Sequence, residues 1–457
     1  MFEKNRVFDL AKFTLDLAEK KTTAIKCAEL YFSVNKYLDV EIEENSIKNS
    51  ELGTDFGTSL RLIDNRGSLG FAFTNYIEKD SLQKLVSRSI KMMRAGTPDP
   101  DFKNLPSPPA KYPNIQNLYD KNLKNIEIEE GINYVEEMIN LCKRDEKAIS
   151  QSAEFSVNYF EEYIFNSNGI EASGKGTNVS VSSNMIAKDP ISKETSFGYD
   201  WQSERQLEDI KPKTVAETAL KKAKRNLNRI KIKNMRAPLI LTPTGTINLI
   251  LRPLASAING ETFQYKRSFL VGKRKKKIGV DALSITDDAL IDGAVGSDIF
   301  DAEGVPGQSQ TIIKNGKFLK TALLHNSYTA HKAGVKSTGN ASRSSYKGIP
   351  SISSTNFKME PGDYGQEEII EEVKKGILLD YTGDSPNITT GDFSGLILQG
   401  NLIENGEISK PLNETMIGVN LLDLFQKIEA ISDQQKVYGK FFAPWVKVRE
   451  VQIIGSK

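Results

Sequence analysis

The chain has 457 residues, which is enough for about two or three domains with hydrophobic cores of their own. It carries 61 Lys and Arg against 59 Asp and Glu, and the resulting net charge of +2 argues against nucleic-acid binding through bulk charge. Two cysteines exclude a disulfide scaffold and a four-cysteine zinc site, and two histidines exclude a His-rich metal site. No stretch approaches about 18 consecutive apolar residues, so we expect a cytoplasmic protein without a membrane partner.

Residues 1–105 predict an N-terminal block that runs helix, strands, helix. Apolar residues at helical spacing predict helices over residues 7–18 and 82–93. Residues 38–43, LDVEIE, alternate between apolar and acidic side chains, as in a strand with one solvent-facing side. The turn residues 64–67 separate two apolar runs and predict a β-hairpin.

A second block with the same order follows a Pro-rich linker. The segment 96–113 contains six prolines, and we place the linker at residues 106–119. Residues 120–228 then predict a helix over 128–142, strands around 155–157, 163–165, 179–181 and 197–199, and a Lys-rich helix over 215–227. The repeated order points to a structural duplication, although no sequence repeat accompanies it.

The third block, residues 236–457, has a different composition. Turns rich in Gly, Asp and Asn separate short apolar runs, which predicts a β-rich domain. Helices are expected near 245–258, 366–375 and 421–431. The predicted fold class is therefore α+β, with N-terminal sheet-and-helix layers, in a possible duplication, followed by a β-rich C-terminal domain.

Four motifs in the chain each have a simple structural explanation. GIEASGKG at 169–176 nearly matches a phosphate-binding loop, but a strand-like segment follows where a helix is needed, which favours a β-turn. The basic run 273–277 lacks interleaved aromatic residues, which favours a solvated loop. The acidic segment 287–303 matches no EF-hand, which favours turn chemistry. His325 and His331 stand six apart, a poor spacing for two metal ligands on one helix face.

Several short segments of the third block occur in the order and approximate spacing of a known family. They are Asp287-Asp288, Ser297, residues 300–304, Asn315-Gly316, and residues 337–341, 390–394, 404–408, 418–420 and 430–433. With these segments the chain resembles the TldD/PmbA family, and Gly70-Phe71-Ala72 resembles its N-terminal domain. The resemblance covers nearly the whole chain.

The resemblance implies one of two kinds of subunit. The TldD kind is a metallopeptidase with HExxxH on a helix and a cysteine near the C-terminus. Two imidazoles and a thiolate leave an open position on zinc, and the Glu takes a proton from metal-bound water. The PmbA kind, also called TldE, lacks these residues and pairs with the TldD kind to degrade or trim peptides.

Comparison with the HExxxH pattern indicates the PmbA kind for this chain. Alignment on residues 259–261 places Leu251, Arg252 and Ser256 at the positions of the first His, the Glu and the second His. The region of the cysteine, 434–440, contains no Cys. We therefore expect no metal, no cofactor and no catalytic residue in this chain. Residues 260–270, in which a Ser-Phe-Leu follows a basic pair, also resemble the PmbA kind.

Three residues after the expected helix are candidates for a surface that faces a peptide or a chamber. They are Tyr265, Lys266 and Arg267. The resemblance thus implies a PmbA/TldE-like subunit of a cytosolic TldD/TldE-type metallopeptidase system, inactive alone, with a TldD-like subunit as its partner and peptides as substrates.

Two alternatives stay open at this stage. The chain could be a homodimeric, non-catalytic binding or modulator protein without a peptidase partner. An early family name refers to modulation of DNA gyrase, but the charge balance does not support contact with nucleic acid. A new hydrolase site could use Asp301, Glu303 or Asp392, although the family resemblance already explains these three residues as turn and frame positions.

Overall fold

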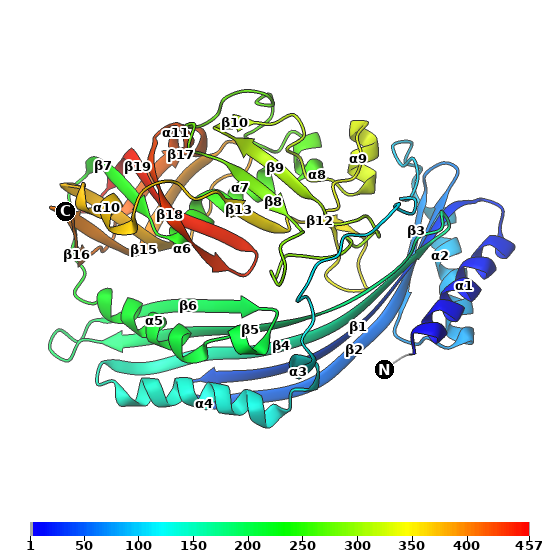
Figure 1. Ribbon diagram of the computed structural model, residues 1–457, viewed down its shortest axis with the longest axis horizontal. Coiled ribbons are helices and arrows are strands. Elements are labelled where there is room, and N and C mark those ends of the chain that lie inside the picture. The colour runs from blue at the N-terminus through cyan, green and yellow to red at the C-terminus, as the bar shows by residue number, and fades with distance from the viewer. Residues whose placement is uncertain (1–2, 457) are drawn as a thin grey trace.

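The computed structural model describes residues 3–456 and contains two layers (Figure 1). A long curved sheet with helices on its outer face forms the N-terminal half, and a β-rich domain lies against the other face of that sheet. This arrangement confirms the predicted α+β fold class. Among the described residues, no helix is both long and apolar enough to cross a membrane.

The N-terminal sheet is built from two halves with the same element order. The first half contains α1 (Lys4–Lys21), β1 (Ile25–Glu43), β2 (Ser46–Asp64), β3 (Leu69–Thr74) and α2 (Lys79–Ala95). After the short helix α3 (Lys121–Asn125), the second half contains α4 (Ile128–Arg144), β4 (Ala148–Asn166), β5 (Glu171–Lys188), β6 (Thr195–Glu204), a 3-10 turn (Leu207–Asp209) and α5 (Pro212–Arg225). The strand order is β3-β2-β1-β4-β5-β6, so the two predicted blocks share one sheet and meet at the antiparallel pair β1–β4.

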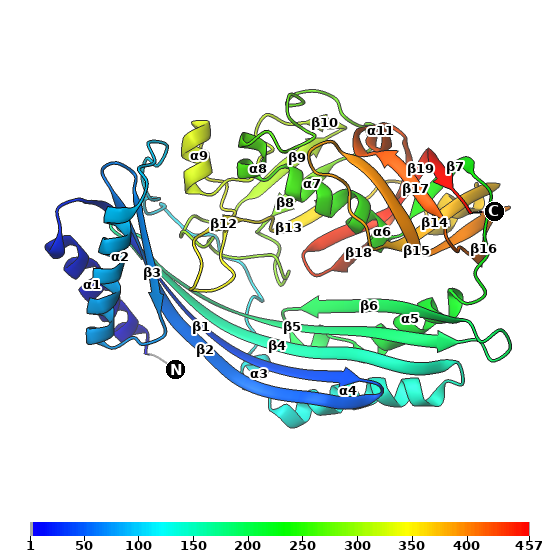
Figure 2. The same ribbon diagram turned by 180° about the vertical axis from the view of Figure 1, so that it is seen from behind.

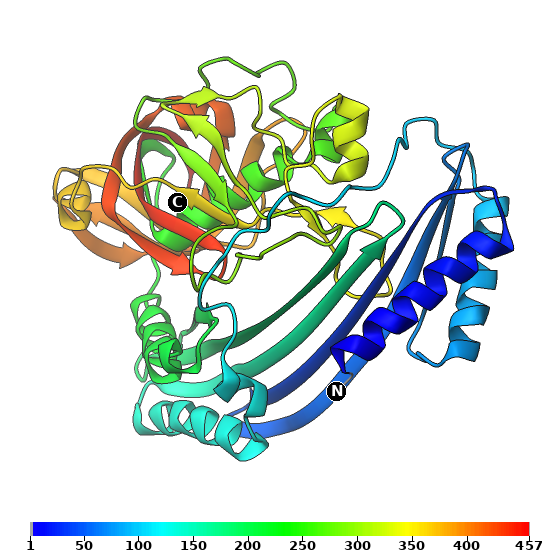
Figure 3. The same cartoon turned by 45° about the vertical axis from the view of Figure 1, so that its right-hand side comes forward.

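Alternation along the strands gives the sheet one face for its own helices and one for the C-terminal domain. Leu30 and Phe32 of β1 pack with α1 and α2 at one end, while Leu38 and Val40 pack with α4 and α5 at the other. Figure 3 shows the two helix pairs at opposite ends of the outer face. Seen from behind in Figure 2, the inner face looks towards the C-terminal domain.

The Pro-rich segment between α2 and α3 runs along the C-terminal domain. The Tyr328 hydroxyl donates a hydrogen bond to Asp99 at 2.8 Å, and the Tyr112 hydroxyl donates one to the Gly304 carbonyl at 2.9 Å. The ring of Tyr112 also packs edge-on against Phe300. The segment therefore wraps over the surface of the C-terminal domain.

The C-terminal domain contains a barrel. Its elements are β7 (Met235–Leu241), α6 (Pro243–Thr246), a π-helix (Ile247–Leu251), α7 (Arg252–Ala257), α8 (Gly260–Gln264), β8 (Ile285–Asp288), β9 (Ser309–Lys314), β10 (Lys317–Phe318), α9 (Ser327–Ala333), β11 (Ala341–Ser342), β12 (Ser351–Ile352), β13 (Asn356–Met359), α10 (Gln366–Glu371), β14 (Lys375–Thr382), β15 (Asp392–Glu404), β16 (Glu407–Pro411), β17 (Met416–Asn420), α11 (Leu421–Gln426), β18 (Ile428–Tyr438) and β19 (Phe441–Ile454). Because β19 pairs with both β17 and β7, the strands β7, β14, β15, β17 and β19 close on themselves.

Some predicted element boundaries were wrong. The helices expected over 366–375 and 421–431 end at Glu371 and Gln426, and strands begin at Lys375 and Ile428. The apolar residues after Gln426 pair with β19 instead of continuing the helix, with Ile428 opposite Val448. The two strands expected at 155–157 and 163–165 form the single strand β4.

The simple explanations for two sequence motifs hold. Gly169 lies in the turn between β4 and β5 with φ +96°, and residues 171–176 belong to β5, so the phosphate-loop resemblance is a β-turn. The basic run 273–277 lies in an irregular, largely exposed segment between α8 and β8.

Candidate functional site

A helical run inside the C-terminal domain presents Arg252 and Ser256 on one open face. The Thr242 hydroxyl caps the start of the run by accepting a hydrogen bond from the Gly245 amide at 3.2 Å. The run widens into a π-turn in which the Arg252 amide donates to the Ile247 carbonyl. This turn directly precedes Pro253, which has no N–H for a regular helical hydrogen bond. Arg252 and Ser256 then lie four residues apart, so they share a face.

Arg252 and Ser256 line a cleft of about 470 Å³ on the surface of the C-terminal domain. Leu251 does not reach it, because its side chain is completely buried in the core of that domain. The other residues that line the cleft come from distant segments. They are Ala255, Asn259, Thr262, Leu324, Ile352, Ser353, Ser354, Lys440 and Phe441.

The cleft is basic. The Arg252 guanidinium donates to the Asn248 side-chain carbonyl at 3.3 Å and lies 5.6 Å from the centre of the Phe441 ring. The Lys440 ammonium donates to the Ser353 hydroxyl at 2.8 Å and to the Ser354 carbonyl at 2.9 Å. Burial and the nearby charge of Arg252 lower the pKa of Lys440, while Asp287 opposes that shift. Of the described residues that line the cleft, none is Asp or Glu.

These side chains do not fit a zinc ion. Zinc is held by thiolates, imidazoles and carboxylates, whereas the cleft offers two cations together with hydroxyl, amide and apolar groups. Across residues 3–456, no group of three or more His, Cys, Asp or Glu side chains is placed to hold a metal ion.

The two histidines are not arranged as a metal-binding pair. His325 is buried, and its Nδ1 lies 3.0 Å from the Thr329 hydroxyl. Burial lowers the pKa of His325 to about 4 and also lowers the pKa of the half-buried His331. His325 therefore matches the prediction of a satisfied core histidine, whereas the Nδ1 of the half-buried His331 has no hydrogen-bond partner among the described residues.

The three further candidates lie outside the cleft. Tyr265, Lys266 and Arg267 are exposed in the turn after α8, and none of them is among the residues that line the cleft. The guanidinium of Arg267 and the ammonium of Lys332 from α9 lie 5.5 and 5.9 Å from the Tyr265 ring centre. Whether this turn faces a peptide stays a prediction.

A second, acidic cavity of about 240 Å³ lies next to the cleft, between the sheet and the C-terminal domain. Lys440, Ser353 and Ser354 line both spaces. More than half of the Asp298 side-chain surface is open, but it opens into this cavity. Burial by the surrounding protein and the charge of Glu162 raise the pKa of Asp298 to about 7, against the effect of Arg205.

The acidic segment 287–303 mainly serves turns, as predicted. Asp301 accepts hydrogen bonds from the amides of Glu303 at 2.9 Å and Val305 at 3.0 Å. Asp288 accepts one from the amide of Leu290 at 2.9 Å. These are the local side-chain-to-backbone bonds by which Asp stabilises turns.

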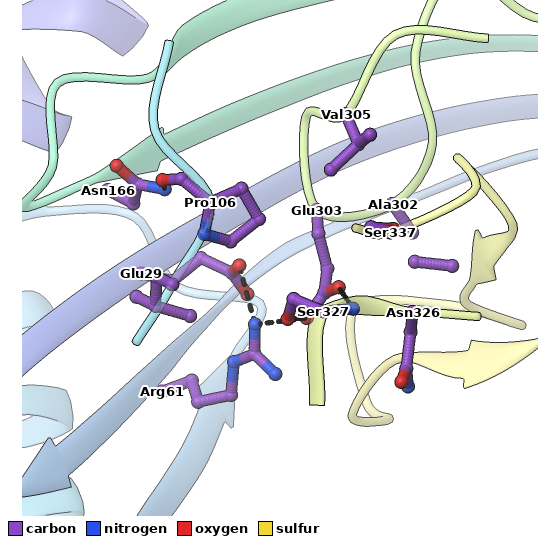
Figure 4. A network of polar contacts seen from close by, with 12 residues as sticks. Glu29, Arg61, Pro106, Asn166, Ala302, Glu303, Val305, Asn326, Ser327 and Ser337 are labelled. Carbon is purple, nitrogen blue, oxygen red and sulfur yellow. Dashed lines mark hydrogen bonds and ion pairs between the residues drawn. The ribbon is translucent and has the colours of Figure 1, made fainter. Parts of the chain in front are cut away.

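Glu303 instead belongs to a buried ion-pair network between the sheet and the C-terminal domain (Figure 4). The Arg61 guanidinium on β2 lies 2.7 Å from Glu29 on β1 and 2.8 Å from Glu303. Ser327 donates to Glu303 through its amide and its hydroxyl, each at 2.7 Å. Asp392, in contrast, is exposed and bonded to Asn420, so Asp301, Glu303 and Asp392 do not form one hydrolytic site.

Family models cover most of the chain. Residues 28–93, 121–227 and 234–455 match the descriptions "PmbA/TldA metallopeptidase domain 1", "central domain" and "C-terminal domain". The chain belongs to the PmbA/TldD family. Three regions of the chain thus carry the three successive domains of this family.

Individual relatives span the same length. A Metalloprotease PmbA homolog of Buchnera aphidicola subsp. Acyrthosiphon pisum is 27% identical, covering 99% of this chain and 98% of that protein. A Metalloprotease TldD homolog of Haemophilus influenzae is also 27% identical, covering 90% of this chain and 86% of that protein. A Bacteroides thetaiotaomicron crystal structure named for modulation of a DNA gyrase superposes with a TM-score of 0.88 at 25% identity, covering both chains completely. TldE from Thermococcus kodakarensis has the same fold, with a TM-score of 0.86 at 24% identity, covering 98% of this chain and 100% of that protein.

Sequence reasoning found part of this cleft and missed the rest. The sequence indicates Arg252 and Ser256 as candidates but does not indicate Lys440, Ser353 or Ser354. A signal for Lys440 was present, because it is the last residue of the 434–440 segment in which the family resemblance implies a cysteine for the TldD kind. Nothing in the local sequence of Ser353 and Ser354 indicates that they lie beside α7.

Proposed function

We propose that this chain is a PmbA/TldE-like subunit of a cytoplasmic TldD/TldE-type peptidase assembly. In this assembly a TldD-like partner carries the zinc, and the two subunits together degrade or trim peptides. The chain alone is inactive, and its cleft contributes a peptide-facing surface without a metal.

The composition of the cleft carries the proposal. In the TldD kind, the resemblance implies metal ligands in a helix and in a segment near the C-terminus. The matching segments of this chain, 251–256 and 434–440, meet in one cleft through Arg252, Ser256 and Lys440. Two cations in that place repel a divalent metal ion. This combination supports a subunit that keeps the fold of the family, while the metal chemistry resides in another subunit.

The names of the relatives do not separate the two kinds of subunit. A PmbA homolog and a TldD homolog are both 27% identical to this chain. The proposal therefore rests on the residues of the cleft.

The test compares the chain alone with a mixture. The purified chain, a TldD-like subunit from the same source, and both together are analysed by light scattering and by cleavage of an unfolded peptide with and without a chelator. We expect a heteromeric species and chelator-sensitive cleavage only in the mixture. A TldD-like subunit with the HExxxH glutamate replaced by Gln serves as control and should still assemble without cleaving.

Two results would contradict the proposal. The first is chelator-sensitive cleavage by this chain alone. The second is a stable homodimer that ignores the TldD-like subunit, which would favour the homodimeric binding or modulator protein.

A further inference from the structure

The basic cleft around Arg252 has the properties of a binding site for an anion. The chain as a whole is nearly neutral, with 61 basic against 59 acidic residues, yet the described lining of this cleft contains two cations and no carboxylate. The local excess of positive charge is therefore a property of this place in the fold. The volume of about 470 Å³ lies within the range of roughly 300–1,000 Å³ that is typical of ligand sites.

Arg252 is available to such an anion. Its guanidinium donates to the neutral side chain of Asn248 and lies over the ring of Phe441, and no carboxylate of residues 3–456 forms an ion pair with it. By contrast, the buried arginines between the sheet and the C-terminal domain, Arg61, Arg205 and Arg343, all have acidic partners. A guanidinium without a carboxylate offers a planar pair of N–H donors that matches a carboxylate.

Lys440 supplies a second cation that the fold holds in position. Two of its three N–H donors are directed to Ser353 and Ser354, which restricts the ammonium to the wall of the cleft. Arg252 is close enough to lower the pKa of Lys440, so the two cations act on the same space. Asp287 is the carboxylate that opposes this charge, and it is engaged by the amide of Asn340 and the backbone of Thr355.

The rest of the lining suits a short peptide. Ala255, Ile352 and Phe441 present apolar surface, while Asn259 and Thr262 present polar groups. A ligand with a carboxylate beside a small apolar side chain therefore matches the cleft in charge and in surface type. The terminal residue of a peptide has this chemistry, and so does an Asp or Glu next to an apolar residue.

From these contacts we infer that the cleft binds a peptide through a carboxylate, with Arg252 as the principal anchor and Lys440 as the second cation. The site belongs to this chain alone and needs neither metal nor partner subunit. It can therefore be tested separately from the pairing with a TldD-like subunit, and either idea can fail without the other.

The test measures fluorescence anisotropy of labelled peptides with the full chain. Three N-terminally labelled Ala/Gly peptides ending in Leu are compared: the free acid, the C-terminal amide, and the amide with one internal Glu. We expect the free acid to bind, and its affinity to fall with increasing salt, because screening weakens the attraction between exposed charges. The amide without an internal Glu should bind with an affinity at least about tenfold lower than that of the free acid. If only the internal Glu restores binding, the carboxylate comes from a side chain; both results support the site.

Variants separate the site from general charge. Arg252→Gln and Lys440→Met should each weaken the free acid about tenfold. Arg236→Gln and Lys317→Met, which change exposed cations elsewhere in the domain, should leave the affinity unchanged. Because Lys440 is partly structural, Arg252→Gln is the decisive variant: its side chain is exposed, and its fold can be checked by circular dichroism. Equal affinity for acid and both amides, no binding at all, or unchanged binding by Arg252→Gln would overturn the inference.

Discussion

At the residue scale, His325 illustrates what close packing does to an ionisable side chain. A Cβ added to Gly260 would lie 2.4 Å from His325 Nδ1, so the glycine leaves room for the ring to pack directly on the backbone. The ring is 4% exposed, and it has a neutral partner, the Thr329 hydroxyl. Burial without a negative partner disfavours the imidazolium and lowers the pKa from 6.5 to about 4.

This packing predicts an acid-sensitive contribution to stability. The folded chain binds the proton of His325 less tightly than the unfolded chain, whose pKa is near 6.5. The contribution is therefore complete above pH 6.5 and is lost as the pH falls towards 4. When the pH is lowered from 7 to 4.5, the free energy of unfolding of the parent chain should fall by about 2.5 kcal/mol more than that of His325→Gln.

Chemical denaturation at the two pH values measures this difference. His331→Gln is the matched control, and it should change the pH dependence less, because His331 is only half buried. An unchanged pH dependence in His325→Gln would contradict the assignment.

The candidate site could be predicted only in part because its polar and charged residues come from three separate segments. Arg252 and Ser256 share one helix face, and this spacing can be read locally. Lys440 precedes β19, and Ser353 follows β12. Their proximity depends on the parallel pairing of β13 with β19, in which Phe357 lies opposite Phe441. A single sequence contains no local signal for that pairing.

At the element scale, one glycine in each edge strand lets a helix pack directly on the sheet. In β3, a Cβ on Gly70 would lie 2.1 Å from the Ser89 carbonyl of α2. In β6, a Cβ on Gly198 would lie 2.1 Å from the Ala219 carbonyl of α5. Since β3 and β6 occupy matching places in the two halves, the same device recurs in both, which strengthens the case for a duplication.

The close approach predicts that Gly198→Ala destabilises the second half of the sheet. The methyl group would push α5 away from β6, and overpacking of this kind costs about 1–3 kcal/mol or more. Gly418→Ala in β17 is the control, because its Cβ would meet only the Gln452 Cβ at 4.0 Å. Thermal unfolding should show a lower midpoint for Gly198→Ala and an unchanged one for Gly418→Ala. Equal midpoints would mean that α5 has room to move.

The sequence predicted elements well where one face of a helix carries the whole apolar signal. The stripes that became α2, α4 and α5 are of this kind. The helix predicted over 421–431 was wrong beyond Gln426, because Ile428 and Ile431 are buried by the sheet and not by a continued helix. Barrel closure was not predictable, since β7 and β19 are about as far apart as the domain allows and pair only in the folded chain.

At the scale of the whole molecule, buried charges connect the two layers. Arg61 on the sheet is 7% exposed and contacts Glu29 on the same sheet and Glu303 of the C-terminal domain. Arg343 of the C-terminal domain reaches back to Glu29. The carboxylates are fully buried, so each depends on its arginine for compensation. Arg205 adds hydrogen bonds to the carbonyls of Val295 and Ser297, each at 2.8 Å.

Removal of Arg61 should therefore loosen the contact between the layers. In Arg61→Met, Glu29 keeps Arg343, but Glu303 retains only the hydrogen bonds from Ser327 and stays buried as a charge. Loss of one partner of a buried pair costs about 3–5 kcal/mol. In calorimetry we expect the first transition to occur at a lower temperature, with the sheet and the C-terminal domain unfolding less cooperatively than in the parent chain.

Two further variants serve as controls. Arg449→Met, which removes an exposed pair with Glu429, should cost less than about 1 kcal/mol. The second change Glu303→Gln removes the uncompensated charge, so Arg61→Met/Glu303→Gln should be more stable than Arg61→Met alone. If the double variant is the less stable of the two, hydrogen bonding of Glu303 matters more than its charge, and this account of the interface is wrong.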